Sequence, residues 1–221
     1  MTIIISCLNL KGGCAKTTSI VNLGGILSEN KLKPLLIDLD EQRSATNWAQ
    51  QGGVKFPYPV IPIVLETASK FKAKIEELAK EHKAEMILID TPPQLEDDAL
   101  VAALLSDVVL IPVTPSPLDL WAAKQAVKMI KEAREERGGE LPKVILIPSR
   151  IMSRTSLARD IKGSLKEFGE PVSPSISSRV AVAESGIAGL PVGHYAPNSP
   201  SHKEFASLWK FVNKNIRKLV K

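Results

Sequence analysis

Between residues 10 and 18 the chain reads Leu10-Lys11-Gly12-Gly13-Cys14-Ala15-Lys16-Thr17-Thr18. An apolar run at residues 3–8 precedes this stretch, and a segment with helical periodicity at residues 16–29 follows it. Glycines between a strand and a helix allow the backbone to curl so that its N–H groups point at phosphate oxygens. The helix N-terminus adds the positive end of its dipole. The stretch therefore predicts a phosphate-binding loop on an α/β sheet.

The side chains of this loop match the chemistry of nucleotide phosphates. Lys16 is placed to reach the β- and γ-phosphates, and the hydroxyl of Thr17 is placed to hold Mg²⁺. The common pattern G-x-x-x-x-G-K-[ST] is not met, because Leu10 and Ala15 stand at its two glycine positions. A methyl group at Ala15 fits the loop if φ stays negative and hinders a left-handed conformation. The alternative is an ordinary glycine-rich turn with two unrelated surface lysines.

Short apolar runs alternate with amphipathic helical segments along the rest of the chain. We expect strands at residues 34–37, 86–89, 108–111 and 144–147, and a short strand within the proline-rich segment 57–62. We expect helices at residues 44–50, 66–81, 118–137 and 201–219. This order predicts an α/β fold: a doubly wound, mostly parallel sheet with helices on both faces, in one domain covering residues 1–221.

The composition is typical of a globular protein, with 44% hydrophobic and 24% charged residues in 221 residues. No stretch approaches the roughly 18 uncharged apolar residues that a membrane span needs. The N-terminus lacks the basic region and small-residue cleavage site of a signal peptide. The two cysteines, Cys7 and Cys14, cannot build a disulfide framework or a four-ligand metal site, so we expect a reducing cytosol.

The excess positive charge lies at the C-terminal end of the chain. Residues 203–221 contain six basic residues and one acid, Glu204, so they carry the whole net charge of +5. At 100° per residue, the lysines and arginine of this segment lie roughly opposite an apolar stripe. One interpretation is a core-packing helix with a solvated basic face. A basic, amphipathic helix that lies on a membrane surface is a rival interpretation.

The loop, Lys-Gly-Gly-x-x-Lys-Thr-Thr, resembles the deviant Walker A motif, xKGGxGK[ST], of the ParA/MinD ATPases. Residues 36–46 resemble the D-x-D-P-Q-x-S-A-T segment of this family, with Glu41 in place of proline. Residues 87–93 resemble its Walker B strand and switch II, and residues 110–119 are similar to the ParF-type plasmid partition ATPases. Larger members carry an N-terminal helix-turn-helix domain, which we do not expect here because the chain starts at the first strand.

The resemblance implies ATP and Mg²⁺ as cofactors, and it assigns site residues. The expected nucleotide contacts come from the loop and from the end of the strand at residues 144–147: Gly12, Gly13, Cys14, Ala15, Lys16, Thr17, Thr18, Ser149 and Arg150. Lys11 is expected to reach across a dimer interface to the ATP of the other subunit. Asp40 would position the attacking water, Asp38 would support the metal site together with Thr17, and Asp90 would act on Mg²⁺ through water. For each aspartate, capping of the following helix is the alternative.

The resemblance also implies a positioning switch in a prokaryotic cytoplasm, associated with the nucleoid. ATP would join two subunits into a homodimer that binds DNA without sequence preference. A cargo-bound adaptor, either ParB-like or specific to a protein compartment, would stimulate hydrolysis. The cargo would be a plasmid, a chromosome or a compartment such as the carboxysome. The expected DNA contacts are the basic residues of the last helix: Lys203, Lys210, Lys214, Arg217 and Lys221.

Two other classes of function share this loop. A membrane-associated regulator of the MinD type would use the last helix as a membrane anchor, but the helix follows the domain without a linker, so we do not expect a membrane partner. A metabolic or redox enzyme, such as dethiobiotin synthetase or the nitrogenase iron protein, is the other class. A cluster-bridging role fails because Cys7 lies within the first strand and Cys14 within the loop.

Overall fold

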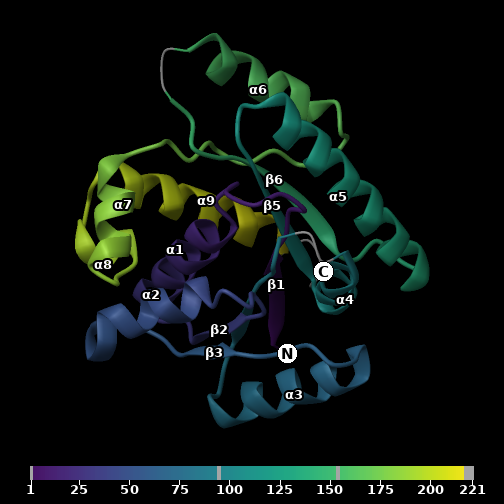
Figure 1. Ribbon diagram of the computed structural model, residues 1–221, viewed down its shortest axis with the longest axis vertical. Helices are drawn as coiled ribbons and strands as arrows, with labels where there is room; N and C mark the ends of the chain where they lie inside the picture. Colours follow the sequence, from purple (N-terminus) through teal and green to yellow (C-terminus); the bar gives the residue numbers. More distant parts are fainter. Residues whose placement is uncertain (1, 94–95, 153–154, 217–221) are drawn as a thin grey trace.

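The computed structural model describes residues 2–93, 96–152 and 155–216. Its centre is a six-stranded sheet with the strand order β3-β2-β4-β1-β5-β6, in which every pair of neighbours is parallel (Figure 1). The strands are β1 (Ile3–Cys7), β2 (Pro34–Asp38), β3 (Val60–Pro62), β4 (Met86–Asp90), β5 (Val108–Val113) and β6 (Lys143–Pro148). The predicted doubly wound α/β class is confirmed.

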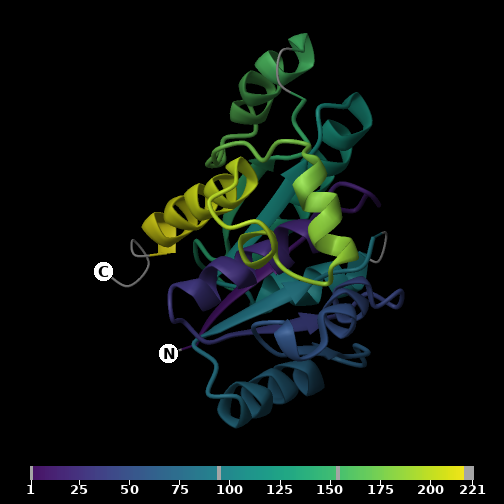
Figure 2. The same cartoon turned by 90° about the vertical axis from the view of Figure 1, so that its left-hand side faces the viewer.

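The described helices cover both faces of this sheet. They are α1 (Lys16–Glu29), α2 (Ser44–Gly52), α3 (Ala68–Glu81), α4 (Glu96–Leu105), α5 (Pro117–Glu136), α6 (Ser156–Lys166), α7 (Val180–Ile187), α8 (Val192–Tyr195) and α9 (Pro200–Ile216). Figure 2 shows α1 and α9 together on one side of the sheet.

The alternation of side chains along each strand separates the two faces. Leu36, Leu88 and Leu110 lie in one apolar cluster with the buried residues of α1 and α9. Their neighbours Val109 and Ile111 lie in another cluster with α5. Because both faces are covered, the strands are nearly continuous apolar runs, as expected for a parallel sheet.

The connections diverge from the middle of the sheet. Helix α1 leads from β1 to β2, which lies beyond β4, while α4 leads from β4 to β5 on the other side of β1. In such sheets ligands bind at the carboxyl ends of the strands near the point of divergence. The register pairs Cys7 with Asp90 and Asp90 with Asp38, so both aspartates lie side by side at this edge.

Sequence reasoning missed four helices, α4, α6, α7 and α8. Apart from its acidic start, α4 (EDDALVAALL) is almost uniformly apolar, so it lacks the 3.6-residue alternation that reveals an amphipathic helix. The helix expected at residues 66–81 begins at Ala68, because the hydroxyl of Thr67 accepts a hydrogen bond from the N–H of Lys70 (3.3 Å) and caps it.

The amphipathic character predicted for the last helix is confirmed over the described part of α9. Its apolar residues are buried in the cluster that α1 also joins: Phe205, Leu208, Trp209, Val212 and Ile216. The apolar face is therefore used for packing and is not open to a membrane surface. Within the described residues, no helix is both long enough and apolar enough to cross a bilayer.

Candidate active site

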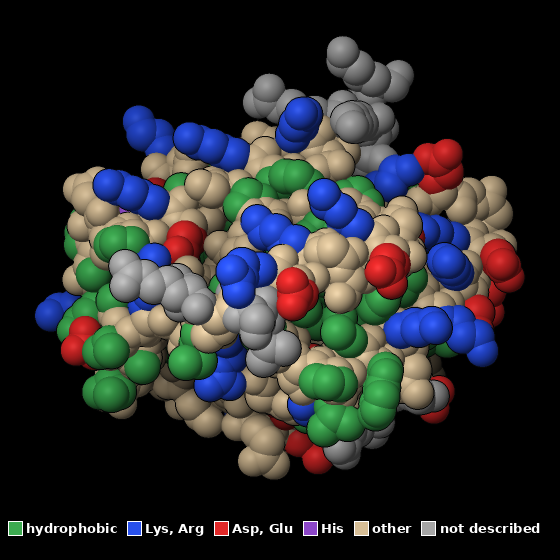
Figure 3. Space-filling model, turned by 90° about the horizontal axis from the view of Figure 1, so that it is seen from above, with side chains coloured by type: hydrophobic (Ala, Val, Ile, Leu, Met, Phe, Trp, Pro, Cys, Tyr) green, Lys and Arg blue, Asp and Glu red, His purple; other side chains and the backbone are tan. Residues whose placement is uncertain are grey.

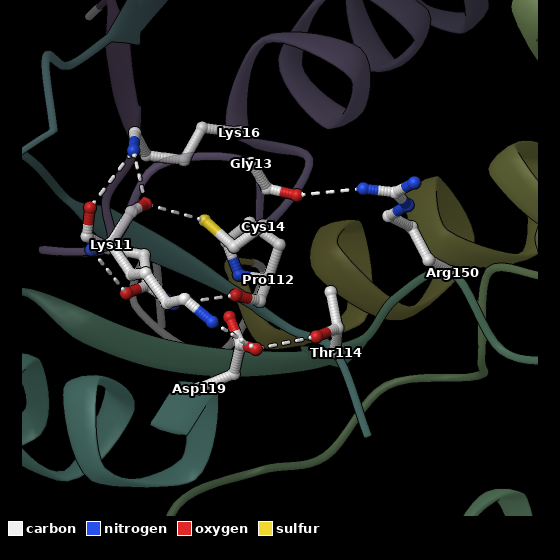
Figure 4. A network of polar contacts seen from close by, with 9 residues as sticks. Lys11, Gly13, Cys14, Lys16, Pro112, Thr114, Asp119 and Arg150 are labelled. Atoms are coloured by element: carbon white, nitrogen blue, oxygen red, sulfur yellow. Dashed lines mark hydrogen bonds and ion pairs between the residues drawn. The ribbon is translucent and has the colours of Figure 1, made fainter. Parts of the chain in front are cut away.

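The loop between β1 and α1 curls by means of two left-handed residues. Gly13 has φ 76°, and Ala15 has φ 77° and ψ 31°. Glycine adopts this conformation freely, whereas a methyl group makes it cost about 1 kcal/mol. Ala15 therefore does not keep the negative φ under which its methyl group fits without strain. Arg150 supports the curl from outside, because its guanidinium donates a hydrogen bond to the carbonyl of Gly13 (3.1 Å; Figure 4).

Lys16 lies folded into the loop. Its Nζ donates hydrogen bonds to the carbonyls of Asn9 and Lys11, each at 3.0 Å, and the residue is only 7% exposed. It also lines the cavity above the loop. The positive charge of Lys16, which the sequence analysis expects to contact the phosphates, is thus present at the site and is held there by two backbone carbonyls.

Lys11 forms an ion pair that sequence reasoning did not find. Its Nζ lies 2.9 Å from Oδ2 of Asp119, which is 3% exposed and also accepts a hydrogen bond from the hydroxyl of Thr114 (2.7 Å; Figure 4). Asp119 lies in the first turn of α5, 108 residues from Lys11, so no local motif links them. In this chain the lysine expected to reach another subunit is bound to its own α5.

Thr17 and Asp90 meet at the carboxyl ends of the central strands. The hydroxyl of Thr17 donates to Oδ2 of Asp90 (2.6 Å), while Oδ1 of Asp90 is buried and has no hydrogen-bond partner among the described residues. Burial raises the pKa of Asp90 to about 7, and Asp38 and Asp40 add to this, although the Thr17 hydrogen bond and Lys16 oppose it. A buried carboxylate oxygen without a donor needs a cation or a water molecule.

This pair fits a Mg²⁺ site of the phosphate-loop kind. The described residues contain no group of three or more histidine, cysteine, aspartate or glutamate residues placed to hold a metal ion. Mg²⁺ in nucleotide sites does not need such a group, because substrate phosphates and waters supply most of its oxygen ligands. The Thr17 hydroxyl and the free oxygen of Asp90 therefore match the metal role expected for them.

Asp38 and Asp40 are placed differently from each other. The Oδ2 of Asp38 accepts hydrogen bonds from the N–H and the hydroxyl of Thr46 (2.8 and 2.7 Å), and its Oδ1 accepts one from the N–H of Asp40 (3.1 Å). Asp38 is thus committed to the start of α2 and to the turn that carries Asp40, and it does not line the cavity above the loop. Asp40 does line that cavity.

The cavity above the loop has a volume of about 550 Å³, enough for a nucleotide. Its floor is formed by Gly12, Gly13, Ala15, Lys16, Thr17 and Thr18. Lys16, Arg150 and Arg179 bring positive charge to the cavity, which favours an anionic ligand. Figure 3 shows further Lys and Arg side chains spread over the upper face of the molecule, among apolar and acidic ones.

Two of the expected nucleotide contacts, Cys14 and Ser149, are buried away from the cavity. The Sγ of Cys14 donates a hydrogen bond to the carbonyl of Lys11 (3.2 Å), and the hydroxyl of Ser149 donates one to the carbonyl of Ile147 (3.1 Å). Neither side chain lines the cavity.

One wall of the cavity was missed by sequence reasoning. Residues of α2, the 176–179 segment, α7 and α9 form this wall: Ser44, Trp48, Ile176, Ser177, Ser178, Arg179, Val182, Ala183, Gly186 and Phe205. The 176–179 segment reaches the site through an isolated parallel bridge between Ile151 and Ser177. Arg179 of this segment contacts Glu204, the one acid of the basic C-terminal segment, and no local sequence motif links these two residues.

The predicted DNA contacts lie on the outer face of α9. Lys203, Lys210 and Lys214 are exposed, and none forms an ion pair within the described part of the chain. Arg217 and Lys221 lie outside the described residues.

Comparisons with known proteins match the chain over most of its length. The family model of the CobQ/CobB/MinD/ParA nucleotide binding domain matches residues 5–192. Maintenance of carboxysome distribution protein A from Halothiobacillus neapolitanus is 30% identical over 187 residues, 83% of each chain. The chromosome-partitioning ATPase Soj from Thermus thermophilus is 27% identical over 233 residues, 92% of each chain. The structure is similar to the Cyanothece McdA–ATP complex, with a TM-score of 0.80 and 18% identity over 96% of each chain.

Proposed function

The chain belongs to the CobQ/CobB/MinD/ParA family of nucleotide-binding domains, and we propose that it is a ParA-type ATPase that positions a cellular cargo. The observation that carries this proposal is the group formed by Lys16, Thr17 and Asp90 under a cavity of nucleotide size. The matched relatives named for carboxysome distribution and chromosome partitioning support the positioning role.

ATP binding would draw on the loop and the lysine folded into it. The backbone N–H groups of the loop and the N-terminus of α1 would hold the phosphates. Lys16 would exchange the carbonyls of Asn9 and Lys11 for phosphate oxygens, which are stronger acceptors because they are charged. Thr17 would hold Mg²⁺ and Asp90 would act on it through water, and the metal would supply positive charge for the phosphates. Asp40, on the cavity wall, would orient the water that attacks.

Dimerisation would require a second exchange, at Lys11. In the structure this lysine is paired with Asp119, so it is available to another subunit only after that ion pair opens. The phosphates of a nucleotide in the facing subunit would offer a more highly charged partner. The ATP-bound homodimer would therefore form at the expense of the contact between Lys11 and Asp119.

The ATP-bound dimer would bind DNA through α9. Three exposed lysines on one stripe of α9, none with an ion pair to another described residue, offer a few phosphate contacts, and a dimer would double their number. A cargo-bound adaptor would stimulate hydrolysis and release the nucleoid. Whether the cargo is a plasmid, a chromosome or a protein compartment depends on that adaptor. The buried apolar face of α9 favours this role over a membrane-associated one.

The proposal is tested by isothermal titration of the nucleotide-free protein with Mg·ATP. We expect Lys16→Ala to lose binding by more than about 100-fold, because it removes the charged group that holds the β- and γ-phosphates. The matched control is Lys72→Ala, an exposed lysine of α3 on the other side of the sheet, which should bind as the wild type does. Wild-type protein that binds no nucleotide, or equal affinity in the two variants, would contradict the proposal.

A further inference from the structure

Glu204 connects the basic helix α9 to the wall of the nucleotide cavity. Its carboxylate accepts hydrogen bonds from the N–H of Ser177 (2.9 Å) and from the hydroxyl of Ser177 (2.8 Å). It also accepts two from the guanidinium of Arg179, from Nη2 at 3.0 Å and from Nε at 3.3 Å. One side chain therefore holds both ends of the Ser177–Arg179 segment.

This segment belongs to the cavity, and α9 touches the cavity as well. Ser177, Ser178 and Arg179 line it, and so does Phe205, the residue that follows Glu204 in α9. Phe205 is fully buried, and the Glu204 side chain is 20% exposed, so the contact is partly shielded from water. Any ligand that fills the cavity rests against a wall that α9 supports.

Apart from Glu204, the isolated bridge between Ser177 and Ile151 holds the backbone of this segment, with the N–H of Ser178 donating to the carbonyl of Ile151 (2.9 Å). In the described part of the chain the segment forms no full strand, and the Arg179 side chain is 40% exposed. In contrast, Glu204 is the only acid within residues 200–216 and is followed on the outer face by Lys210 and Lys214. The acid of this basic helix is thus the residue that contacts the Ser177–Arg179 wall of the cavity.

We propose that Glu204 is the positioning residue that couples nucleotide binding to the basic face of α9. It holds the Ser177–Arg179 wall in the shape that receives the nucleotide. A nucleotide resting on that wall in turn holds Glu204, and with it the helix that carries Lys203, Lys210 and Lys214. Such coupling is reciprocal, so DNA bound to α9 raises the affinity for nucleotide by the same factor. This inference rests on the function proposed above.

The test compares Glu204→Gln with Glu184→Gln. Glu184 lies on α7, next to the cavity wall, and accepts a long hydrogen bond (3.5 Å) from the hydroxyl of Tyr195. Both variants remove one negative charge, so they change the net charge of the molecule equally. Two quantities are measured in each: KM and kcat for ATP hydrolysis, and the ratio of the DNA Kd without Mg·ATP to the DNA Kd with it.

We expect Glu204→Gln to raise KM for ATP about tenfold with kcat within about twofold, because it loosens binding and leaves the reacting groups in place. At saturating Mg·ATP, the ratio of DNA Kd values should fall below the wild-type ratio, to the part that dimerisation alone supplies. Glu184→Gln should keep the wild-type KM and ratio. Equal behaviour of the two variants, with a wild type that responds to ATP, would overturn the inference and leave the proposed function intact. A wild type without nucleotide-dependent DNA binding would instead contradict the proposed function.

Arg179→Gln removes the other partner of the same ion pair. Because Arg179 is exposed, this variant can replace Glu204→Gln in the test if Glu204→Gln does not fold. Because the two side chains act through one contact, the double variant should raise KM no further than either single variant. Additive increases in KM would show that Glu204 and Arg179 act independently, and would overturn the inference.

Discussion

The lysines of the phosphate loop and the lysines of α9 are held in opposite ways. Lys11 and Lys16 have fixed partners within 3.0 Å, a carboxylate for one and two carbonyls for the other. Lys203, Lys210 and Lys214 are exposed and have no ion pair within the described residues. At the loop, the position of each positive charge determines its function. On α9, the number of positive charges determines the affinity for DNA. Substitutions at the loop and on α9 should therefore impair different properties of the protein.

The largest effect should come from Lys11. We expect Lys11→Ala to retain ATP binding and to lose the ATP-dependent dimer, because the alanine side chain cannot reach the phosphates of the facing subunit. Analytical ultracentrifugation with and without Mg·ATP measures this. A variant that dimerises with ATP as the wild type does would remove Lys11 from the interface and contradict the view that its position matters.

The next effect belongs to α9. Lys210→Glu combined with Lys214→Glu should weaken DNA binding by about 30-fold at low salt and flatten its salt dependence, since phosphate contacts are lost. ATP hydrolysis should stay within about twofold of the wild type, because neither lysine lines the cavity. Fluorescence anisotropy at two salt concentrations measures the DNA affinity.

The matched control for this pair is Lys72→Glu with Lys80→Glu, which makes the same charge change on the exposed face of α3. If both double variants lose DNA binding equally, the net charge of the molecule matters and the location of the α9 stripe does not.

A smaller effect, in the opposite direction, is expected at Asp119. Asp119→Asn removes the ionic partner of Lys11 and keeps a side chain of the same shape near Thr114. Freed from this ion pair, Lys11 should strengthen the ATP-dependent dimer by about fivefold, in line with a partly exposed pair worth about 1 kcal/mol. Sedimentation equilibrium across protein concentrations measures the dimer Kd. A weaker dimer in Asp119→Asn would show that Asp119 supports the interface instead of competing for it.

The fold and most of the loop could be predicted from the sequence, because their signals are local. The glycines, Lys16 and Thr17 stand next to each other, and the apolar face of α9 repeats at helical spacing. The pair of Thr17 and Asp90 was also within reach, since Thr17 begins the helix that follows the first expected strand and Asp90 follows the expected strand at residues 86–89, at the edge where parallel strands end.

The remaining parts of the site depend on contacts between distant residues. The ion pair of Lys11 with Asp119 spans 108 residues, and the Ser177–Arg179 wall is brought to the cavity by a single bridge and by Glu204. Neither contact has a periodicity or a motif. Side-chain direction at the end of β6 was also beyond sequence reasoning. Both Ser149 and Arg150 were expected to contact the nucleotide, but the Ser149 side chain turns inward and only Arg150 lines the cavity.

A further effect concerns the pH dependence of stability. Asp90 has a pKa of about 7 in the folded protein, well above its value of about 3.9 in an unfolded chain. Between these values the folded state binds a proton that the unfolded state does not, so the free energy of unfolding falls as pH rises from about 4 to about 7. Asp90→Asn should lack this decline, which is at most about 1.4 kcal/mol per pH unit. Urea unfolding without nucleotide or Mg²⁺ measures it, and parallel curves for the two proteins would contradict the prediction.

The central claim is that nucleotide held by the fixed lysines controls the free lysines of α9. The most direct measurement is a titration of the wild-type protein with DNA of random sequence, with and without Mg·ATP, at one fixed salt concentration. The account predicts that Mg·ATP tightens DNA binding by at least about tenfold, since dimerisation doubles the phosphate contacts. Equal DNA affinity in the presence and absence of Mg·ATP would contradict it.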